Sequence, residues 1–205
     1  MAEIDSLLAK FIEQQIMIQF GNDLNQTIKN RIFERYGVNL TDALRQYEPF
    51  DKILREFFGK AADGMIRQLF EKICFVKKTK QTLSLEIRDK IFANLLLESY
   101  GHKDKKAILL AVSSSALSIS KILKQARISS QTTGYRLIND LIKDGLLVES
   151  GFDLTTDGKK THAYISPIKK INIILGDKNI MCVTIEFSDE LIAKSGILNT
   201  VITNG

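Results

Sequence analysis

The chain has 205 residues, of which 44% are hydrophobic and 26% are charged, a composition typical of a globular protein with one or two domains. No run approaches the roughly 18 consecutive apolar residues that a membrane-spanning helix requires. The N-terminus lacks the basic region and small-residue cleavage site of a signal peptide. We therefore expect a cytoplasmic protein with no membrane partner.

The formal net charge of +5 is concentrated in one part of the chain. Residues 102–170 contain 12 Lys and Arg against 6 Asp and Glu, a net charge of +6, whereas residues 1–101 carry +1 and residues 171–205 carry −2. Basic side chains that neutralise phosphates release condensed counterions, so this segment is a candidate for nucleic-acid binding. The alternative is a basic surface that is merely solvated.

Residues 1–76 predict a helical domain. Apolar side chains recur there at the spacing of one helix face, and most runs end at a glycine, which readily takes the left-handed conformation of a helix C-terminus. Asn22 or Asp23 can cap the second helix, and Pro49 suits the first turn of the third. Residues 38–48 are expected to connect them, with one short helical turn. The predicted helices cover 1–20, 24–36, 49–58 and 61–77, with glycines at 21, 37 and 59.

Residues 77–101 predict a linker and a connecting helix. Lys77 to Thr82 are polar and basic without apolar periodicity, as is typical of a domain boundary. From Leu83 to Tyr100 apolar residues return at helical spacing. We therefore expect one helix that joins the N-terminal domain to the basic segment.

Residues 102–167 predict three helices and a β-hairpin, the arrangement of a winged helix-turn-helix. Apolar residues from Ile119 onward stand at i, i+3 and i+4, which makes one face of a short supporting helix. Ser129 or Ser130 can cap the following helix, and Gly145 can end it. A turn rich in Asp, Gly and Lys then separates two extended runs. The expected elements are helices over 104–114, from 119 and over 129–144, and strands from 146 and from 162 around a turn at 156–160.

Residues 168–205 predict a second β-hairpin and a short helix over 189–194 that Ser188 caps. Residues 200–205 are expected to be loose. Because side chains alternate along a strand, only one of two sets can face the core. The apolar set is Met181, Val183, Ile185 and Phe187.

Two short motifs carry a resemblance to known proteins. Thr133-Gly134-Tyr135-Arg136 lies in the predicted recognition helix, and Asp144-Gly145-Leu146-Leu147 precedes a Lys-Lys turn and a tyrosine. With them, about a third of the chain resembles archaeal winged-helix transcription regulators of the bacterial arsenic-repressor and multiple-antibiotic-repressor type. The resemblance implies a DNA-binding regulator with a mainly α fold and a small β component.

A second resemblance covers residues 20–76. Arg35-Tyr36-Gly37-Val38 and Phe57-Phe58-Gly59-Lys60-Ala61-Ala62, with the apolar spacing around them, are similar to a small helical output-domain family from thaumarchaeal regulators. This implies a module attached to signalling or transcription proteins. We expect it to bind an effector or a partner protein.

A recognition helix lies in the major groove and contacts base edges with its N-terminal half. Gln can pair with adenine and Arg with guanine through two hydrogen bonds, so we predict direct readout by Gln131 and Arg136. Hydroxyls of the first turn would bind phosphate, and lysines of the supporting helix and hairpin tip would add sequence-independent affinity. Tyr135 either contacts DNA or packs between helix and hairpin. The predicted DNA contacts are Lys121, Lys124, Ser129, Ser130, Gln131, Thr132, Thr133, Tyr135, Arg136, Asn139, Lys159 and Lys160.

The sequence contains no constellation that predicts catalysis. A phosphate-binding glycine loop, paired zinc ligands and a nucleophile elbow are all missing, so we expect neither an enzyme nor a cofactor or metal. Cys74 and Cys182 lack redox or metal spacing and are predicted to be small buried hydrophobes. His102 and His162 are expected at the surface.

One winged helix covers few base pairs, so useful affinity for double-stranded DNA requires two copies on neighbouring half-sites. We therefore expect a homodimer, formed through residues 1–20, residues 83–100 or the C-terminal hairpin. For the first of these segments the alternative is packing against the chain's own core. The alternative function is a winged-helix module that binds proteins in a transcription or signalling assembly without reading DNA sequence.

Overall fold

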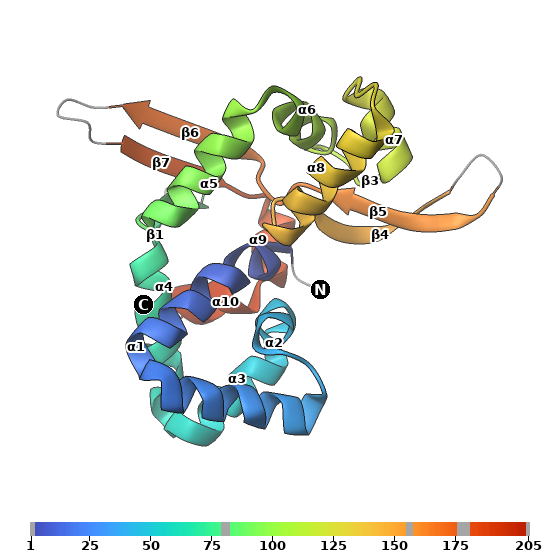
Figure 1. Cartoon of the computed structure of the whole chain (residues 1–205). Coiled ribbons are helices and arrows are strands. Elements are labelled where there is room, and N and C mark those ends of the chain that lie inside the picture. Colours follow the sequence, from blue (N-terminus) through green and yellow to red (C-terminus); the bar gives the residue numbers. More distant parts are fainter. Residues whose placement is uncertain (1–2, 79–82, 155–157, 176–180, 204–205) are drawn as a thin grey trace.

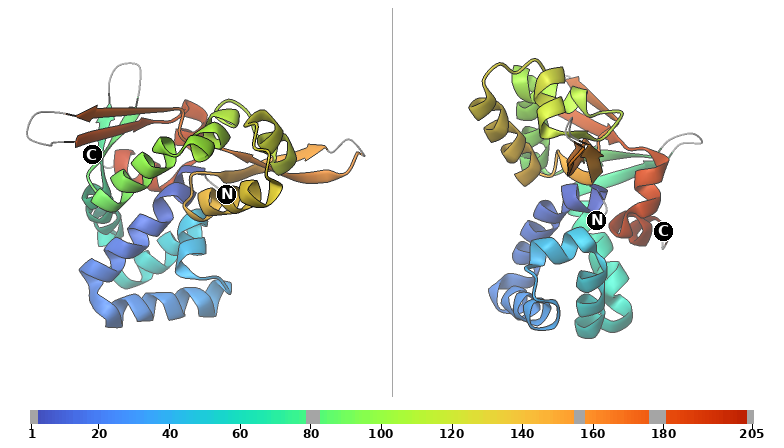
Figure 2. Two further views of the ribbon diagram at one scale, coloured as in Figure 1. Left: turned by 45° about the horizontal axis from the view of Figure 1, so that its top comes forward. Right: turned by 90° about the vertical axis from the view of Figure 1, so that its right-hand side faces the viewer.

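The computed structural model describes residues 3–78, 83–154, 158–175 and 181–203, and within these ranges the fold is mainly helical with two small antiparallel sheets (Figure 1). The expectation of a mainly α protein with a small β component is confirmed. The first four helices and the C-terminal helix that lies beside them make up one half of the molecule, and the helices between residues 90 and 143 with two projecting hairpins make up the other (Figure 2).

Most helix boundaries of the N-terminal half lie close to the predicted positions. The first is interrupted at Gly21, whose φ of 72° is not helical, and it ends where the amide of Gly37 donates to the carbonyl of Phe33 at 2.8 Å. The next helix begins where the side chain of Asn39 accepts from the amide of Asp42. The elements are α1 (Glu3–Tyr36), α2 (Leu40–Gln46), α3 (Glu48–Phe58), the 3₁₀ turn η1 (Gly59–Ala61) and α4 (Ala62–Ile73).

The apolar stripe at the start of α1 packs against the chain's own core. Its side chains are at most 2% exposed. Of the two alternatives for residues 1–20, packing on the chain's own core is therefore the correct one for this stripe, and the stripe offers no free face to a second subunit. The stripe consists of Ile4, Leu7, Leu8, Phe11, Ile12 and Ile16.

The first sheet corrects two predictions. The helix expected to reach residue 77 ends at Ile73, and the helix expected from Leu83 is a strand at that end. The sheet has the order β1-β2-β7-β6, so it joins segments from the middle and the end of the chain. Of the expected linker, residues 79–82 lie outside the described residues. The strands are β1 (Cys74–Lys78), β2 (Leu83–Ile87), β6 (Lys170–Leu175) and β7 (Met181–Glu186).

The predicted apolar face of the second hairpin is confirmed for the residues whose side chains are described. Val183, Ile185 and Phe187 are 1%, 0% and 5% exposed, whereas the side chain of Met181 lies outside the described residues. Burial of alternate residues on this strand fixes its register against β2, where Leu85 pairs with Ile185.

In the described part of residues 89–165 there are four helices, three of them in the basic segment, and a three-stranded sheet of order β3-β5-β4. Asp89 caps the first helix by accepting from the amide of Phe92 at 2.8 Å, and Gly145 follows the last with a φ of 74°. The elements are α5 (Lys90–Gly101), α6 (Lys103–Ala111), β3 (Leu117–Ser118), α7 (Ile119–Gln125), α8 (Gln131–Lys143), β4 (Val148–Leu154) and β5 (Lys160–Ile165).

The C-terminal segment packs against α1 and is not loose. Ser188 caps α9 (Asp189–Lys194) as predicted, but residues up to 203 form α10 (Gly196–Thr203), which corrects the expectation for residues 200–203. The carboxylate of Asp5 accepts from the amide of Gly196 at 2.9 Å and thereby satisfies the start of α10. Residues 204–205 lie outside the described residues.

The two halves are in direct contact. The backbone of α1 lies so close to Gly145 that a Cβ added there would be 2.8 Å from the carbonyl oxygen of Ser6. Lys10 forms an ion pair with Asp144 at 3.1 Å across the same contact. The predicted domain boundary at residues 76 and 77 falls inside β1. Among the described helices, none is long and apolar enough to cross a membrane.

Candidate nucleic-acid interface

The start of α8 follows the predicted capping chemistry. Of the two candidate serines, Ser130 is the cap, because its hydroxyl accepts from the amide of Thr133 at 3.4 Å and also lies 3.1 Å from the Thr133 hydroxyl. Ser129 is exposed beside it. The helix N-terminus therefore faces solvent with hydroxyls around it, a setting that suits a phosphate group.

Helix α8 has one buried face and one solvent face. Leu137, Ile138 and Leu141 are at most 5% exposed, while Ile142 is half-buried. The predicted base-reading side chains lie on the opposite face, and those of Gln131 and Arg136 are exposed. The other exposed residues of this face include Thr132, Tyr135, Asn139 and, one turn after Arg136, the acidic Asp140, with Thr133 half-buried at its margin.

A glycine sets the distance between α7 and α8. A Cβ added to Gly134 would be 2.4 Å from one methyl carbon of Leu123 and 3.3 Å from a methyl carbon of Ile128. Any larger side chain would have to displace this packing, so the close crossing explains a residue that is otherwise unfavourable inside a helix. Because α7 packs against the Gly134 side of α8, the opposite side of α8 faces solvent.

The β4–β5 hairpin projects from the body beside α7 and α8 (Figure 1). Lys159 and Lys160 are exposed toward its far end, and residues 155–157 of the predicted turn lie outside the described residues. Phe152 stands opposite His162 in the register, with ring centroids 5.2 Å apart, and Leu154 stands opposite Lys160. One face of the hairpin therefore combines exposed apolar and basic side chains.

Lys121 is engaged within the molecule. Its ammonium donates to Asp153 at 2.6 Å, and the same carboxylate accepts from the amide of Ser118 at 3.2 Å. The hydrogen bond from Lys121 and those from Ser118 lower the pKa of Asp153 to about 2. The predicted phosphate contact at Lys121 thus competes with an ion pair, whereas Lys124 on the same helix is exposed.

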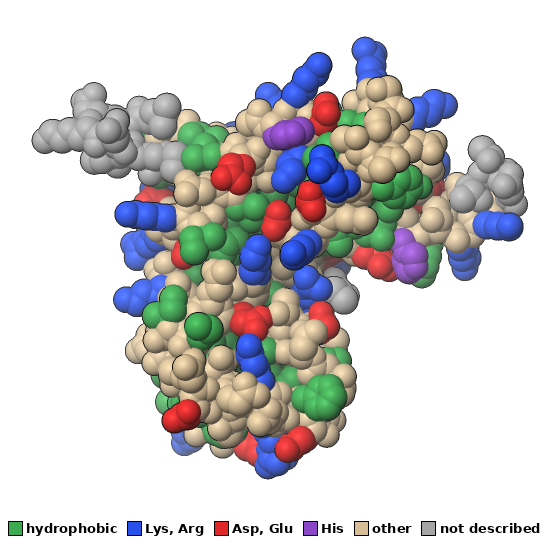
Figure 3. All heavy atoms as spheres, in the orientation of Figure 1, with side chains coloured by type: hydrophobic (Ala, Val, Ile, Leu, Met, Phe, Trp, Pro, Cys, Tyr) green, Lys and Arg blue, Asp and Glu red, His purple; other side chains and the backbone are tan. Residues whose placement is uncertain are grey.

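The structure adds a basic residue that the sequence did not single out. Arg127 is exposed in the turn between α7 and α8, and its φ of 56° is a conformation that side chains other than glycine rarely take. Its position two residues before the predicted recognition helix could have identified it as a candidate phosphate contact. Lys and Arg side chains are spread over the α6 and α7 end and the end of the hairpin (Figure 3).

Of the two cysteines predicted to be buried, Cys74 is buried and Cys182 is half-buried. Burial raises the pKa of the Cys74 thiol. His102 caps α6 by accepting from the amides of Asp104 and Lys105, and His162 lies 2.7 Å from Glu149. Among the described residues, no group of three or more His, Cys, Asp or Glu side chains could hold a metal ion.

No family model, curated protein or solved structure matches this chain. The function is therefore inferred from the residues and geometry of this molecule.

Proposed function

We propose that residues 102–167 form a winged helix-turn-helix and that the protein is a DNA-binding regulator of transcription, of the arsenic-repressor and multiple-antibiotic-repressor type that the motifs at residues 133–136 and 144–147 resemble. The observation that carries the proposal is the exposed polar face of α8 beside a projecting hairpin (Figure 1) that carries the exposed Lys159 and Lys160. In this arrangement α7 supports α8, α8 enters the major groove and the hairpin acts as the wing.

The contacts divide by chemistry. Gln131 and Arg136 can each make two hydrogen bonds to a base, and Tyr135 and Asn139 continue their face of α8. The remaining residues supply charge or hydroxyls to phosphates, which gives affinity without sequence preference. These are Lys124, Arg127, Ser129, Ser130, Thr132, Thr133, Lys159 and Lys160.

We also propose that two copies bind neighbouring half-sites, because one recognition helix contacts only a few base pairs. The buried stripe of α1 leaves residues 83–100 and the β6–β7 hairpin as the predicted dimer contacts. Ile91 on α5 and Ile174 on β6 are 58% and 61% exposed, which suits either surface. Sedimentation of the protein at micromolar concentration tests this, and a monomer contradicts it.

The deciding experiment is the salt dependence of duplex binding. Fluorescence anisotropy with a labelled random-sequence duplex is expected to give a linear fall of log affinity with log salt concentration, with a slope of about −0.9 for each phosphate neutralised. Neutralisation of three or more phosphates predicts a slope of about −3 or steeper. Absence of duplex binding at low salt, or a flat slope, would overturn the proposal.

One observation favours the second candidate, a protein-interaction module. Phe152 and Leu154 are 65% and 60% exposed on the hairpin, and large exposed apolar side chains that lie close together often mark protein contacts. If Phe152→Ser leaves duplex binding unchanged while Lys160→Ala weakens it, the wing contacts DNA through its charge. If the protein fails to bind any duplex, the hairpin becomes the leading candidate for a protein contact.

A further inference from the structure

A groove of about 390 Å³ runs along the edge of strand β1. Its lining includes the consecutive residues Phe75 and Val76, whose side chains point to opposite faces of the sheet, so the groove follows the edge of the strand. Strand β2 lies at the other edge of β1, and no described residue of β2 lines the groove. Helices α4 and α10 form the walls, with Arg67, Phe70 and Glu71 on α4 and Val201 and Ile202 on α10.

The backbone of β1 is paired on one side only within the described sheet. In the order β1-β2-β7-β6, β1 is an end strand, and it pairs with β2 from Cys74 to Lys78. Alternate N–H and C=O groups of an end strand point away from its neighbour and need another partner, which water or a further strand can supply. The groove therefore lies where a fifth strand would be added.

The two faces of β1 differ in polarity. On one face Val76 is half-buried and stands opposite Leu85, which is fully buried. On the other face Phe75 is 44% exposed, and the guanidinium of Arg88 lies 4.8 Å from the centre of its ring. Because side chains alternate along a strand, an added strand would place apolar side chains beside Val76 and charged ones on the side of Arg88.

The charges around the groove indicate the charge of its partner. Lys78 is exposed at the groove, and Lys72 and Arg88 are exposed in a neighbouring hollow that shares Glu71 with it. With Arg67, four cationic residues stand against one acidic residue in the two linings. This excess of positive charge attracts an acidic partner and repels a basic one.

The lysines of β1 disfavour a second copy of this chain as the partner. In a two-fold antiparallel pair of β1 strands, Lys77 and Lys78 of both copies would lie within a ladder of five residues. Like charges on neighbouring strands are destabilising, and lysines on end strands are a common means of preventing such self-pairing. The groove therefore suits a different chain.

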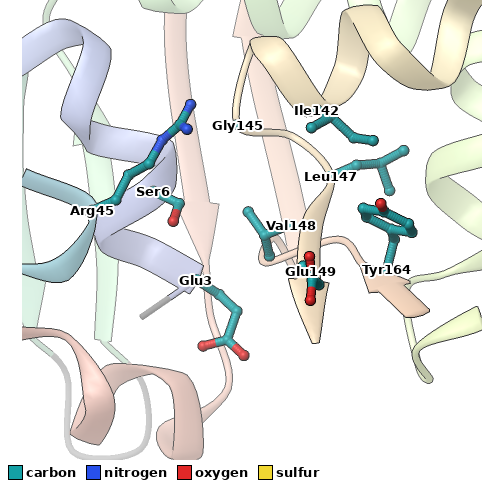
Figure 4. Close-up of a pocket in the computed structure, with 9 residues that line it drawn as sticks. All are labelled: Glu3, Ser6, Arg45, Ile142, Gly145, Leu147, Val148, Glu149 and Tyr164. Atoms are coloured by element: carbon teal, nitrogen blue, oxygen red, sulfur yellow. The ribbon is translucent and has the colours of Figure 1, made fainter. Parts of the chain in front are cut away.

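The cavity between the two halves of the molecule lacks such convergence. It measures about 190 Å³, and the side chains of Glu3 and Arg45 point to opposite ends of it (Figure 4). Glu149, a third charged residue of its lining, is paired with His162 at 2.7 Å. The larger groove beside β1 instead combines a strand edge, apolar walls and an excess of one charge.

We propose that this groove binds an extended, acidic segment of another protein as a fifth strand on β1. The backbone of the segment pairs with β1, its apolar side chains lie beside Val76, and its carboxylates face Lys78 and Arg88. The proposal does not depend on DNA binding, because the lining of the groove contains no residue of α8 or of the β4–β5 hairpin.

The test uses the full chain and short capped peptides in which valine alternates with a charged residue, with affinity measured by fluorescence anisotropy. The valine–glutamate peptide should bind about tenfold or more tightly than the valine–lysine peptide. It should exceed by a similar factor a peptide of the same composition whose valines stand in one block. Equal affinity for the three peptides, or no binding of the valine–glutamate peptide at high micromolar concentration, would overturn the proposal.

Methylation of the peptide backbone tests for strand pairing. In a β-ladder, alternate residues direct their N–H groups toward the neighbouring strand and the others direct theirs away. N-methylation of one alternate set should abolish binding of the valine–glutamate peptide, and N-methylation of the other set should leave it nearly unchanged. Equal effects of the two sets would show that charge alone holds the peptide, which contradicts the proposal.

A charge reversal tests the location of the site. Lys78→Glu leaves the core untouched and should weaken the valine–glutamate peptide about threefold or more while it strengthens the valine–lysine peptide. Lys60→Glu, in η1 before the opposite end of α4, makes the same change of charge and should alter neither affinity. Equal effects of the two variants would place binding elsewhere and overturn the proposal.

A second variant and two competition experiments complete the test. Val201→Trp narrows the groove from α10 and should abolish binding of the valine–glutamate peptide, while circular dichroism confirms that the helices remain folded; unchanged binding contradicts the proposal. Dissociation of a dimer by the peptide, measured by sedimentation, would make β1 a contact between copies. Displacement of the peptide by random-sequence duplex would make the groove part of a nucleic-acid surface. Either result would overturn the assignment to another protein.

Discussion

Lys121 on α7 and Asp153 on β4 form an ion pair of 2.6 Å that ties the supporting helix to the hairpin. Asp153 also accepts from the amide of Ser118, so its carboxylate joins three elements. Because its pKa is lowered to about 2, the carboxylate stays ionised at every pH at which the protein would be studied. A negative charge therefore stands permanently beside the surface that we propose for phosphates.

Asp153→Asn is expected to strengthen duplex binding. The substitution removes a charge that repels phosphates and frees Lys121 to contact one, so the slope of log affinity against log salt should steepen by about one unit. Salt titrations of the variant and the wild type measure this. Asp51→Asn, which removes a paired carboxylate from α3, is the matched control and should change neither affinity nor slope. Weaker binding in Asp153→Asn would show that the pair serves to orient the hairpin.

Arg136→Ala and Lys124→Ala should have different effects. Loss of a side chain that reads a base reduces the preference for one sequence by about 1–3 kcal/mol, whereas loss of a phosphate contact weakens all sequences alike. Affinities for a selected site and for random duplex separate the two cases. Lys60→Ala in η1 removes an equal charge from the other half and should leave both affinities unchanged. Identical effects of the first two substitutions would contradict the assignment of Arg136.

Much of the helical framework could be predicted because its signals are local. Gly21, Gly37 and Gly145 interrupt or follow helices with φ values between 66° and 74°, and Ser130 and Ser188 cap helices that begin one residue later. The apolar spacing of α8 fixed which of its faces is exposed. The predicted candidate residues of this helix therefore share one surface.

The missed elements depend on contacts far along the chain. Leu83, Leu85 and Ile87 alternate with polar residues, but this strand pairs with β7 almost a hundred residues later, and helical spacing nearby suggested a longer helix. Helix α10 starts at an amide held by Asp5, at the other end of the chain. Likewise, no local pattern pairs Lys121 with a residue of the hairpin.

Gly145→Ala should destabilise the protein more than Gly151→Ala. Both glycines have positive φ, 74° and 80°, so alanine costs roughly 1–2 kcal/mol at either position. Only at Gly145 would the new Cβ meet backbone, 2.8 Å from the oxygen of Ser6 and 2.9 Å from the Cα of Leu7, whereas Gly151 has nothing within 4 Å. Overpacking adds roughly 1–3 kcal/mol, which urea denaturation can measure.

Equal losses of unfolding free energy in these two variants would mean that α1 moves away from α8 at little cost. A larger loss at Gly145 instead indicates that the contact between the halves is rigid. Circular dichroism of both variants, recorded before denaturation, checks that neither substitution changes the helix content.

Asp5 predicts an unusual dependence of stability on pH. Its carboxylate is fully buried, and this burial raises its pKa to about 6 although hydrogen bonds from Ser195, Gly196 and Ile197 act in the opposite direction. The ordinary value is 3.8, so the folded protein binds the proton more tightly than the unfolded chain does. The contribution of this group is present in full below about pH 4 and is lost as the pH rises through 6, and it amounts to roughly 3 kcal/mol.

Asp5→Asn isolates this contribution. Other carboxylates titrate in the same pH range, but they are present in both proteins and cancel in the difference between them. The amide oxygen of asparagine can still accept from Gly196, and the side chain carries no proton that titrates. We expect the free energy of unfolding of the wild type, relative to the variant, to fall by roughly 3 kcal/mol between about pH 4 and pH 7. Urea denaturation across this range measures the difference. A constant difference would mean that the hydrogen bonds to Asp5 at least offset its burial, so that folding does not raise the pKa of the carboxylate.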